Sequence, residues 1–314
     1  MKSAAVTGSA GFIGSTLVET LLAEGWSVRG IDSFLPSYEV EPRRALSSRM
    51  MQRPGYTFFE GDLTVDDLGD LVDGVDVVFH LAARPGVRAS WDEFGPYIAA
   101  NLEGTKRLLD AVVRSRVGRF VFSSSSSVYG QAATFPTREE TVPQPMSPYG
   151  VSKAAAEQLV RAYESQFELD ACILRYFTVF GPRQRSDMAF HKWIKAILSG
   201  QEIVMYGDGT TVRDFTYVED VVGATMSAVT LPAGTTCNVA GGSPAALQEV
   251  IGVLEELAGT VKVRYEDMQR GDPRQTGGDT SLLRELTGWK PEWSLRQGLE
   301  RQLDSIRLIT ISGG

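Results

Sequence analysis

The sequence predicts an α/β fold in which a doubly wound parallel sheet is followed by a smaller C-terminal domain. Through about residue 175, short apolar runs alternate with helical patterns, as expected when parallel strands are joined by helices. Beyond that point the alternation lapses, and helices, short strands and glycine loops remain. We therefore expect one domain over 1–175 and a substrate-binding domain over 176–314, with 213–240 partly returning to the sheet.

The first strand and helix are joined by a glycine-rich turn. An apolar run at 4–6 is followed by Gly8, Gly11 and Gly14, and then by a helical pattern of leucines. Glycines allow the backbone to turn tightly and approach a pyrophosphate, which can rest on the helix N-terminus. The second strand ends at Asp32, which can accept hydrogen bonds from an adenosine ribose and would repel the 2′-phosphate of NADP. These features predict a Rossmann-type domain that binds NAD, although Asp32 alone could be a turn residue.

The elements that follow are predicted from apolar runs and their spacing. Further strands of the sheet are expected at 56–60, 76–81, 119–122 and 171–177, with a surface loop or short helix over 35–55 and helices at about 93–115 and from 148. In the C-terminal domain we expect a helix at about 188–199, a short strand at 202–205 and a strand-like segment at 213–217.

Polar residues come directly after the strands of the sheet. They are Asp62, Arg84, the serines at 123–127 and Thr178. Because the carboxyl ends of parallel strands meet at one edge, we expect a ligand crevice there. His80, at the end of one buried run, is expected to be a hydrogen-bonded core or strand-end residue.

The helix that begins near Pro148 carries a candidate general base. Proline suits the first turn of a helix, and the alanine-rich run after Lys153 favours its continuation. Tyr149 and Lys153 then lie four residues apart on one face. A free tyrosine titrates near ~10, and a fixed positive charge beside it lowers that pKa and favours the phenolate. The pair is a candidate for proton abstraction, the alternative being an ordinary exposed helix face.

The composition excludes some classes of partner. With a net charge of −8 and 22% charged residues, the chain lacks the basic surface that nucleic acid favours. No apolar run approaches the ~20 residues that cross a bilayer, so no membrane association is expected. Cys172 and Cys237 lie far apart in apolar runs and are expected to be buried thiols in a reducing compartment. With no signal-peptide pattern, a cytoplasmic location is expected, and no metal site is expected.

Several of these segments together resemble the extended short-chain dehydrogenase/reductase superfamily, and within it the NAD-dependent nucleotide-sugar epimerases. The resemblance covers nearly the whole chain. The segments that carry it are the glycine turn at 7–14, His80-Leu81-Ala82-Ala83, the serines before Val128-Tyr129-Gly130, Tyr149 with Lys153, Arg175-Tyr176-Phe177 and the segment 213–218. The resemblance implies a tightly held NAD that takes a hydride from C4 of a UDP-sugar and returns it. It also implies a homodimer formed through helices near 93–115 and 149–167.

The resemblance further implies roles for individual residues. Tyr149 would be the base, Lys153 would bind the nicotinamide ribose, and Ser125 would supply a hydroxyl donor. The other expected cofactor contacts are Gly8, Gly11, Phe12, Ile13, Gly14, Asp32, Asp62, Leu63, Leu81, Ala82, Ala83, Asn101, Ser123 and Tyr176. The expected substrate contacts are Arg88, Ser126, Ser127, Thr178, Arg185, Arg213, Asp272 and Arg274.

Departures from the family pattern narrow the expected reaction. Sugar 4,6-dehydratases carry an Asp-Glu pair, and UDP-glucuronate decarboxylases a Glu, at the positions of Ser126 and Ser127, so elimination chemistry lacks its base here. Thr178 and Arg185 resemble the bacterial UDP-glucuronate 4-epimerases and could bind a sugar carboxylate. The alternative for Arg185 is a diphosphate contact or a solvated surface residue.

The expected reaction is therefore the conversion of UDP-glucuronate to UDP-galacturonate through a 4-keto intermediate. The alternatives are a 4-epimerase of UDP-glucose or UDP-N-acetylglucosamine, a UDP-glucuronate decarboxylase, and a non-catalytic NAD-sensing regulator on the same fold. The presence of both Tyr149 and Lys153 counts against the regulator.

Overall fold

A parallel sheet of seven strands, in the order β11-β6-β5-β4-β1-β2-β3, forms the centre of the described chain. The structure is a computed structural model that describes residues 1–36, 39–268 and 271–312. The strands of the sheet are β1 Ser3–Thr7, β2 Ser27–Asp32, β3 Tyr56–Glu60, β4 Val77–His80, β5 Arg119–Ser125, β6 Ala171–Tyr176 and β11 Thr236–Val239. The α/β fold class predicted from the sequence is confirmed.

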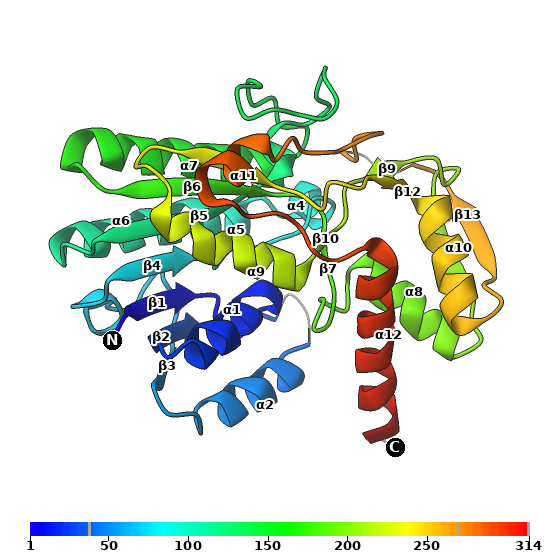
Figure 1. Ribbon diagram of the computed structural model, residues 1–314, viewed down its shortest axis with the longest axis horizontal. Coiled ribbons are helices and arrows are strands. Elements are labelled where there is room, and N and C mark those ends of the chain that lie inside the picture. Colours follow the sequence, from blue (N-terminus) through cyan, green and yellow to red (C-terminus); the bar gives the residue numbers. More distant parts are fainter. Residues whose placement is uncertain (37–38, 269–270, 313–314) are drawn as a thin grey trace.

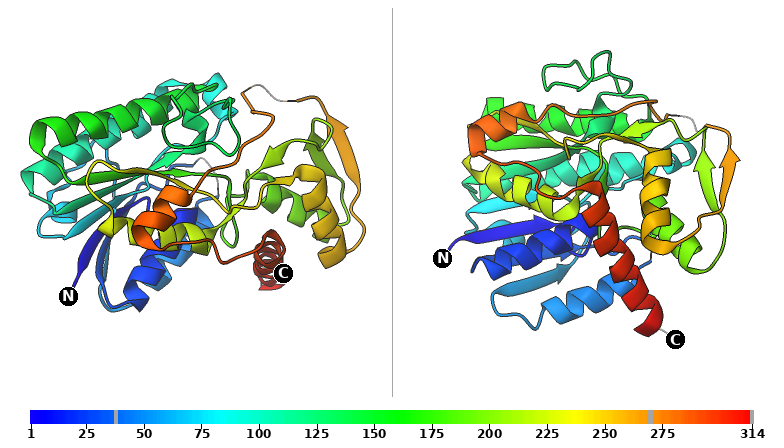
Figure 2. Two further views of the ribbon diagram at one scale, coloured as in Figure 1. Left: turned by 45° about the horizontal axis from the view of Figure 1, so that its top comes forward. Right: turned by 45° about the vertical axis from the view of Figure 1, so that its right-hand side comes forward.

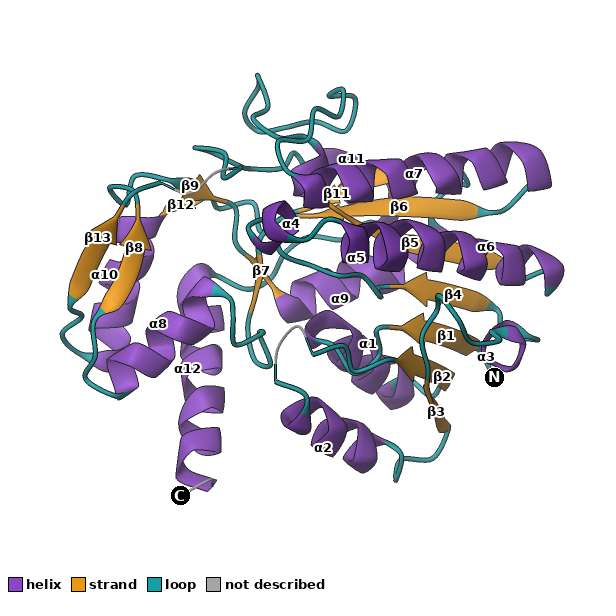
Figure 3. Ribbon diagram, turned by 180° about the vertical axis from the view of Figure 1, so that it is seen from behind, coloured by secondary structure: helices purple, strands orange, loops and turns teal. Residues whose placement is uncertain are grey.

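Helices cover both faces of this sheet (Figures 1 and 2). On one face α1 (Phe12–Ala23) packs beside α9 (Val218–Ser227), and on the other α6 (Gly104–Arg114) packs beside α7 (Pro148–Phe167). Figure 3 shows the molecule from the side opposite to Figure 1, with α6 and α7 in front of the sheet. The shorter elements are α2 Glu41–Met50, α3 Gly69–Val72, α4 Ala89–Asp92, and the 3₁₀ turns η2 Ser126–Val128 and η3 Ala228–Thr230. Among the described residues, no helix combines the length and apolarity that a membrane span requires.

The helix expected at about 93–115 contains a wide turn. It consists of α5 (Gly95–Ile98), the π-helical turn η1 (Ala99–Glu103) and α6. Such turns commonly place a side chain for a specific contact. Here the turn carries Asn101, whose Oδ1 accepts from the Arg84 N–H at 2.7 Å and whose Nδ2 donates to the Arg84 carbonyl at 3.1 Å. The π turn therefore fixes the loop that follows β4.

The C-terminal part forms a smaller group of elements at the carboxyl ends of the strands. They are β7 Val179–Phe180, α8 Ala189–Leu198, β8 Ile203–Tyr206, β9 Val212–Arg213, β10 Thr216–Tyr217, β12 Ala245–Ala246, α10 Leu247–Ala258, β13 Val263–Glu266 and α12 Leu295–Ser312, whereas α11 Ser281–Thr287 packs against β11 of the sheet. β8 pairs with β13, β7 with β10, and β9 with β12. Between these pairs the chain returns to the sheet, because α9 packs on α1 and β11 pairs with β6.

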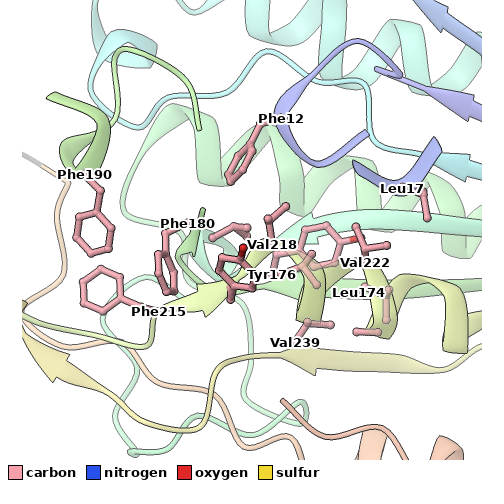
Figure 4. Close-up of a cluster of buried hydrophobic side chains, with 14 of the residues drawn as sticks. Phe12, Leu17, Leu174, Tyr176, Phe180, Phe190, Phe215, Val218, Val222 and Val239 are labelled. Carbon is pink, nitrogen blue, oxygen red and sulfur yellow. The ribbon is translucent and has the colours of Figure 1, made fainter. Parts of the chain in front are cut away.

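One buried apolar cluster continues from the sheet into the smaller group (Figure 4). Leu174 and Val239 belong to it on the strands, and Phe180, Phe190 and Phe215 extend it. The rings of Phe190 and Phe215 lie 4.8 Å apart and those of Phe180 and Phe190 5.5 Å apart. The two parts of the chain thus share a hydrophobic core.

His80 and the two cysteines lie in the interior as expected. The His80 ring bonds to the Thr7 hydroxyl at 2.7 Å and to the Thr105 hydroxyl at 2.9 Å. Burial, with the nearby charge of Lys153, lowers the pKa of His80 to about 3, so the ring is neutral. Cys172 and Cys237 are free, buried thiols.

Candidate active site

A cavity of about 1150 Å³ lies at the carboxyl ends of the strands. The glycine turn and the ends of β2, β4, β5 and β6 line one side, while α8, β8 and β9 line the other. A single small ligand usually occupies ~300–1,000 Å³, so this cavity has room for two ligands side by side. Of the residues predicted for the site, all except Asn101 and Arg274 lie on its wall.

The glycine turn is packed so closely against neighbouring main chain that no side chain fits at Gly8 or Gly14. Gly8 has φ +69°, and a Cβ there would meet the Ala82 nitrogen at 2.9 Å. A Cβ on Gly14 would lie 2.1 Å from the Gly8 carbonyl oxygen. The first turn of α1 contains no acidic residue, so its N-terminal N–H groups face the cavity without a competing negative charge. This arrangement fits a dinucleotide pyrophosphate.

Asp32 is held rigidly at the end of β2. Its carboxylate accepts from the Ala10 N–H at 3.1 Å, from the Phe34 N–H at 2.9 Å and from the Arg43 guanidinium at 2.6 Å. A carboxylate offers about four lone-pair positions, so it retains capacity for a ribose hydroxyl. Asp62 also lines the cavity, and its Oδ1 accepts from the N–H and hydroxyl of Thr64, both at 2.8 Å.

Tyr149 lies in the first turn of α7, which is well defined at its start. The Ser147 hydroxyl caps the helix by accepting from the Gly150 N–H at 3.1 Å, and Pro148 occupies the first turn. The Tyr149 N–H donates to the Ser90 hydroxyl at 3.0 Å. This main-chain anchoring sets the position of the phenol on the cavity wall.

Lys153 is buried one turn further along α7. Its ammonium donates to the Ser123 carbonyl at 2.6 Å and lies 4.4 Å from the centre of the Phe122 ring. Burial lowers the pKa of Lys153 to about 8, although Glu157 acts in the opposite direction.

The expectation that Lys153 lowers the pKa of Tyr149 stays a prediction, and other groups act on this phenol in the structure. Burial raises the pKa of Tyr149, while a hydrogen bond with Ser125 and the charge of Arg185 oppose this rise. The Lys153 ammonium is directed at the Ser123 carbonyl. Burial therefore favours the neutral phenol.

Arg185 reaches the cavity wall near Tyr149. Its side chain is 15% exposed, so it does not lie in bulk water. Its Nε and Nη2 atoms donate to the two carboxylate oxygens of Asp187 at 2.8 and 2.6 Å. Thr178, Ser126 and Ser127 line the same cavity. Hydroxyl and guanidinium donors thus line the cavity that also holds the phenol of Tyr149.

Arg88 and Arg213 are two further cationic residues of the cavity wall. Arg88 pairs with Asp272 at 3.0 Å and stacks over the Tyr206 ring at 4.2 Å. Burial lowers the pKa of Arg213, with Asp272 acting in the opposite direction. The group can receive a diphosphate and a nucleoside.

Asn101 and Arg274 do not line the cavity: Asn101 is buried behind its wall, and Arg274 is exposed on the surface. Both polar atoms of the Asn101 side chain are engaged, since besides its bonds to Arg84 it donates to the Ser152 hydroxyl at 2.9 Å. The structure therefore does not support direct cofactor contact by Asn101, which instead holds a loop of the wall. Arg274 contributes its main chain, because its N–H donates to Gln131 at 2.9 Å and its carbonyl accepts from Val212 at 3.0 Å.

Sequence reasoning missed several residues of the wall. They are Arg43, Asp187, Lys192, Trp193 and Tyr206. Arg43 belongs to a segment that looked like polar surface, and its approach to Asp32 depends on how α2 folds back. Asp187 stands two residues after Arg185, which was the one available signal.

Fold and site together define a class of protein, a dinucleotide-binding enzyme of the short-chain dehydrogenase/reductase type. Its cavity holds a tyrosine-lysine pair, and cationic residues on a second wall can receive a nucleotide sugar. A comparison of sequences is more specific. The chain belongs to the NAD dependent epimerase/dehydratase family, whose sequence model matches residues 4–240.

Individual relatives span almost the whole chain. An uncharacterised UDP-glucose epimerase of Bacillus subtilis is 40% identical over 303 residues, covering 95% of this chain and 96% of that protein. A UDP-glucuronate 4-epimerase of Thermodesulfobacterium geofontis is 35% identical, covering 95% and 94%. The crystal structure of a UDP-glucuronic acid 4-epimerase from Bacillus cereus, in complex with UDP-glucuronic acid and NAD, has a TM-score of 0.95 and 38% identity, covering 98% and 99%.

Proposed function

We propose that this chain is an NAD-dependent isomerase that epimerises C4 of UDP-glucuronate to give UDP-galacturonate. The observation that carries the proposal is the position of Arg185, whose side chain is only 15% exposed. It lines the cavity together with Thr178, and its charge acts on the pKa of Tyr149. A sugar carboxylate bound there would meet charge-assisted donors beside the base that acts at C4. The similarity to UDP-glucuronate 4-epimerases supports the same substrate.

NAD, held along the glycine turn and Asp32, would accept the C4 hydride and return it to the opposite face of the sugar. Tyr149 would remove the C4 hydroxyl proton with help from Ser125, and Lys153 would hold the nicotinamide ribose.

The intermediate requires control of its carboxylate. When C4 is a ketone, the C6 carboxylate is β to a carbonyl and can leave as CO₂ if the C5–C6 bond aligns with the carbonyl π system. Arg185 with Thr178 would hold the carboxylate away from that alignment. Ser126 and Ser127 offer no carboxylate base for elimination at C5, so epimerisation remains the favoured outcome.

UDP-glucose is the second candidate substrate. Asp187 neutralises Arg185 within the cavity, which lowers the cost of placing a neutral hydroxymethyl group beside the guanidinium. Incubating the purified protein separately with UDP-glucuronate, UDP-glucose and UDP-N-acetylglucosamine, followed by chromatographic separation of the epimers, distinguishes these. We expect the highest kcat/KM for UDP-glucuronate; a higher value for either neutral sugar would contradict the assignment.

We also infer a homodimer in the cytoplasm. Phe94, Ile98 and Val151 are large apolar side chains that are 39%, 38% and 45% exposed on the helices flanking the candidate site, which supports a helical interface. The free thiols support a reducing compartment. Light scattering after gel filtration should give twice the chain mass, and Ile98→Glu with Val151→Glu should reduce it to one.

A further inference from the structure

We propose that Gln302 on α12 is a positioning residue for the carboxylate end of the site, because it fixes the segment between Thr178 and Arg185. The inference rests on the proposed function and deepens it. Gln302 is 1% exposed. Its side-chain amide bonds to Gly181 and Gln184, not to Tyr149 or Arg185.

Two glutamine side chains form a continuous buried chain of hydrogen bonds behind this segment. Gln302 accepts from the Gly181 N–H at 3.1 Å and donates to the Gln184 side-chain oxygen at 2.8 Å. Gln184, itself 5% exposed, donates to the Val179 carbonyl at 3.2 Å and accepts from the His191 N–H at 3.1 Å. The backbone N–H groups of Gly181 and His191 require acceptors, so they fix the orientation of both amides.

The network joins three elements to one short segment. Val179 belongs to β7, His191 to α8 and Gln302 to α12, and all of them are tied to Gln184. The segment itself has an unusual backbone: Arg183 has φ +67°, a left-handed conformation that residues other than glycine rarely adopt. A backbone of this kind persists only where its surroundings hold it.

A glutamine at position 302 suits the selection of one conformation of the segment better than it suits core packing. Its neighbours on α12, Leu299, Leu303 and Ile306, are buried apolar residues that pack in the main core. An apolar side chain at 302 would continue that packing without the desolvation cost of an amide. A buried, satisfied amide pair instead selects one arrangement of the segment.

The chemical consequence concerns the 4-keto intermediate. If the segment shifts, Arg185 no longer holds the carboxylate away from alignment with the ketone. The C5–C6 bond then breaks, CO₂ leaves, its electron pair becomes the C4–C5 enolate, and C5 takes a proton from water. The product has lost the C6 carboxyl group.

The test is Gln302→Leu, assayed with UDP-glucuronate labelled with ¹³C at C6. We expect the ratio of released CO₂ to epimerised product to rise about 10-fold or more, since a displacement of ~1 Å can alter a reactive geometry by up to about 10²-fold. Gln184→Leu should give the same change, and the double variant no more than either alone, because both residues act in one network.

Leu303→Ala is the matched control. It destabilises the same helix through the core and leaves both glutamine amides of the network in place, so its ratio of CO₂ to epimer should equal that of the wild type. If Gln302→Leu and Gln184→Leu lower thermal stability but leave the ratio unchanged, the positioning role is overturned; if Gln302→Leu does not fold, Gln184→Leu decides alone. A wild type that epimerises only neutral UDP-sugars would instead overturn the proposed substrate.

Discussion

At the scale of single residues, the phenol of Tyr149 is the group on which turnover should depend most. Burial raises its pKa, and the opposing influences are Ser125 and Arg185. Tyr149→Phe removes the proton acceptor while keeping the ring that packs edge-on to Tyr97 with centroids 6.3 Å apart. We expect kcat to fall by roughly 10²–10⁴-fold. Binding of NAD and UDP, measured by calorimetry, should be nearly unchanged, and wild-type-like turnover would remove Tyr149 from this role.

Arg185 should determine the fate of the intermediate rather than its formation. Arg185→Ala removes the donors that would hold the C6 carboxylate, and it leaves the carboxylate of Asp187 in the same cavity. We expect the fraction of pentose product and CO₂ to increase, and KM for UDP-glucuronate to rise by about 10- to 100-fold for the loss of a charge-assisted contact. Analysis of products by chromatography checks this; epimerisation with no CO₂ release would contradict it.

At the scale of elements, Asp214 joins the turn between β9 and β10 to two other segments. Its carboxylate, 1% exposed, accepts from the Gly242 N–H at 3.0 Å and the Gly278 N–H at 3.3 Å. Burial raises the pKa of Asp214 to about 6. Because the unfolded carboxyl ionises first, its stabilising contribution is full below about pH 4 and is lost as pH rises to about 6.

The expected size of this effect is roughly 3 kcal/mol in the free energy of unfolding, since one pKa unit corresponds to about 1.4 kcal/mol. Asp214→Asn cannot ionise, so the stability difference between wild type and variant should shift in favour of the wild type as pH falls from 7 to 4. Urea unfolding at a series of pH values measures this difference. A difference that does not change with pH would show that Asp214 titrates normally.

Much of the sheet and its ligand-facing edge could be predicted from the sequence, for physical reasons that are local. Strand runs, the glycine turn and the capped start of α7 at Ser147 depend on nearby residues. The pairing of Arg43 with Asp32 and of Gln302 with Gln184 depends on how distant segments meet. The π turn at Asn101 was also missed, because an apolar pattern does not reveal a locally widened helix.

At the scale of the whole molecule, the shared core should make the sheet and the smaller group unfold together. Phe180 is 1% exposed and lies at the junction, with Phe190, Phe215 and Tyr217 around it. Phe180→Ala should cost about 3–5 kcal/mol in the free energy of unfolding. Calorimetry should still record a single transition at a lower temperature, whereas two separate transitions would show that the core does not couple the parts.

The position of α12 in the chain has a consequence for biosynthesis. Every strand of the central sheet precedes residue 240, so the segments that carry the glycine turn and Asp32 are synthesised well before α12. Gln302 emerges only afterwards. On the role proposed for Gln302, protection of the sugar carboxylate against loss as CO₂ would therefore be the last property that synthesis adds to this molecule.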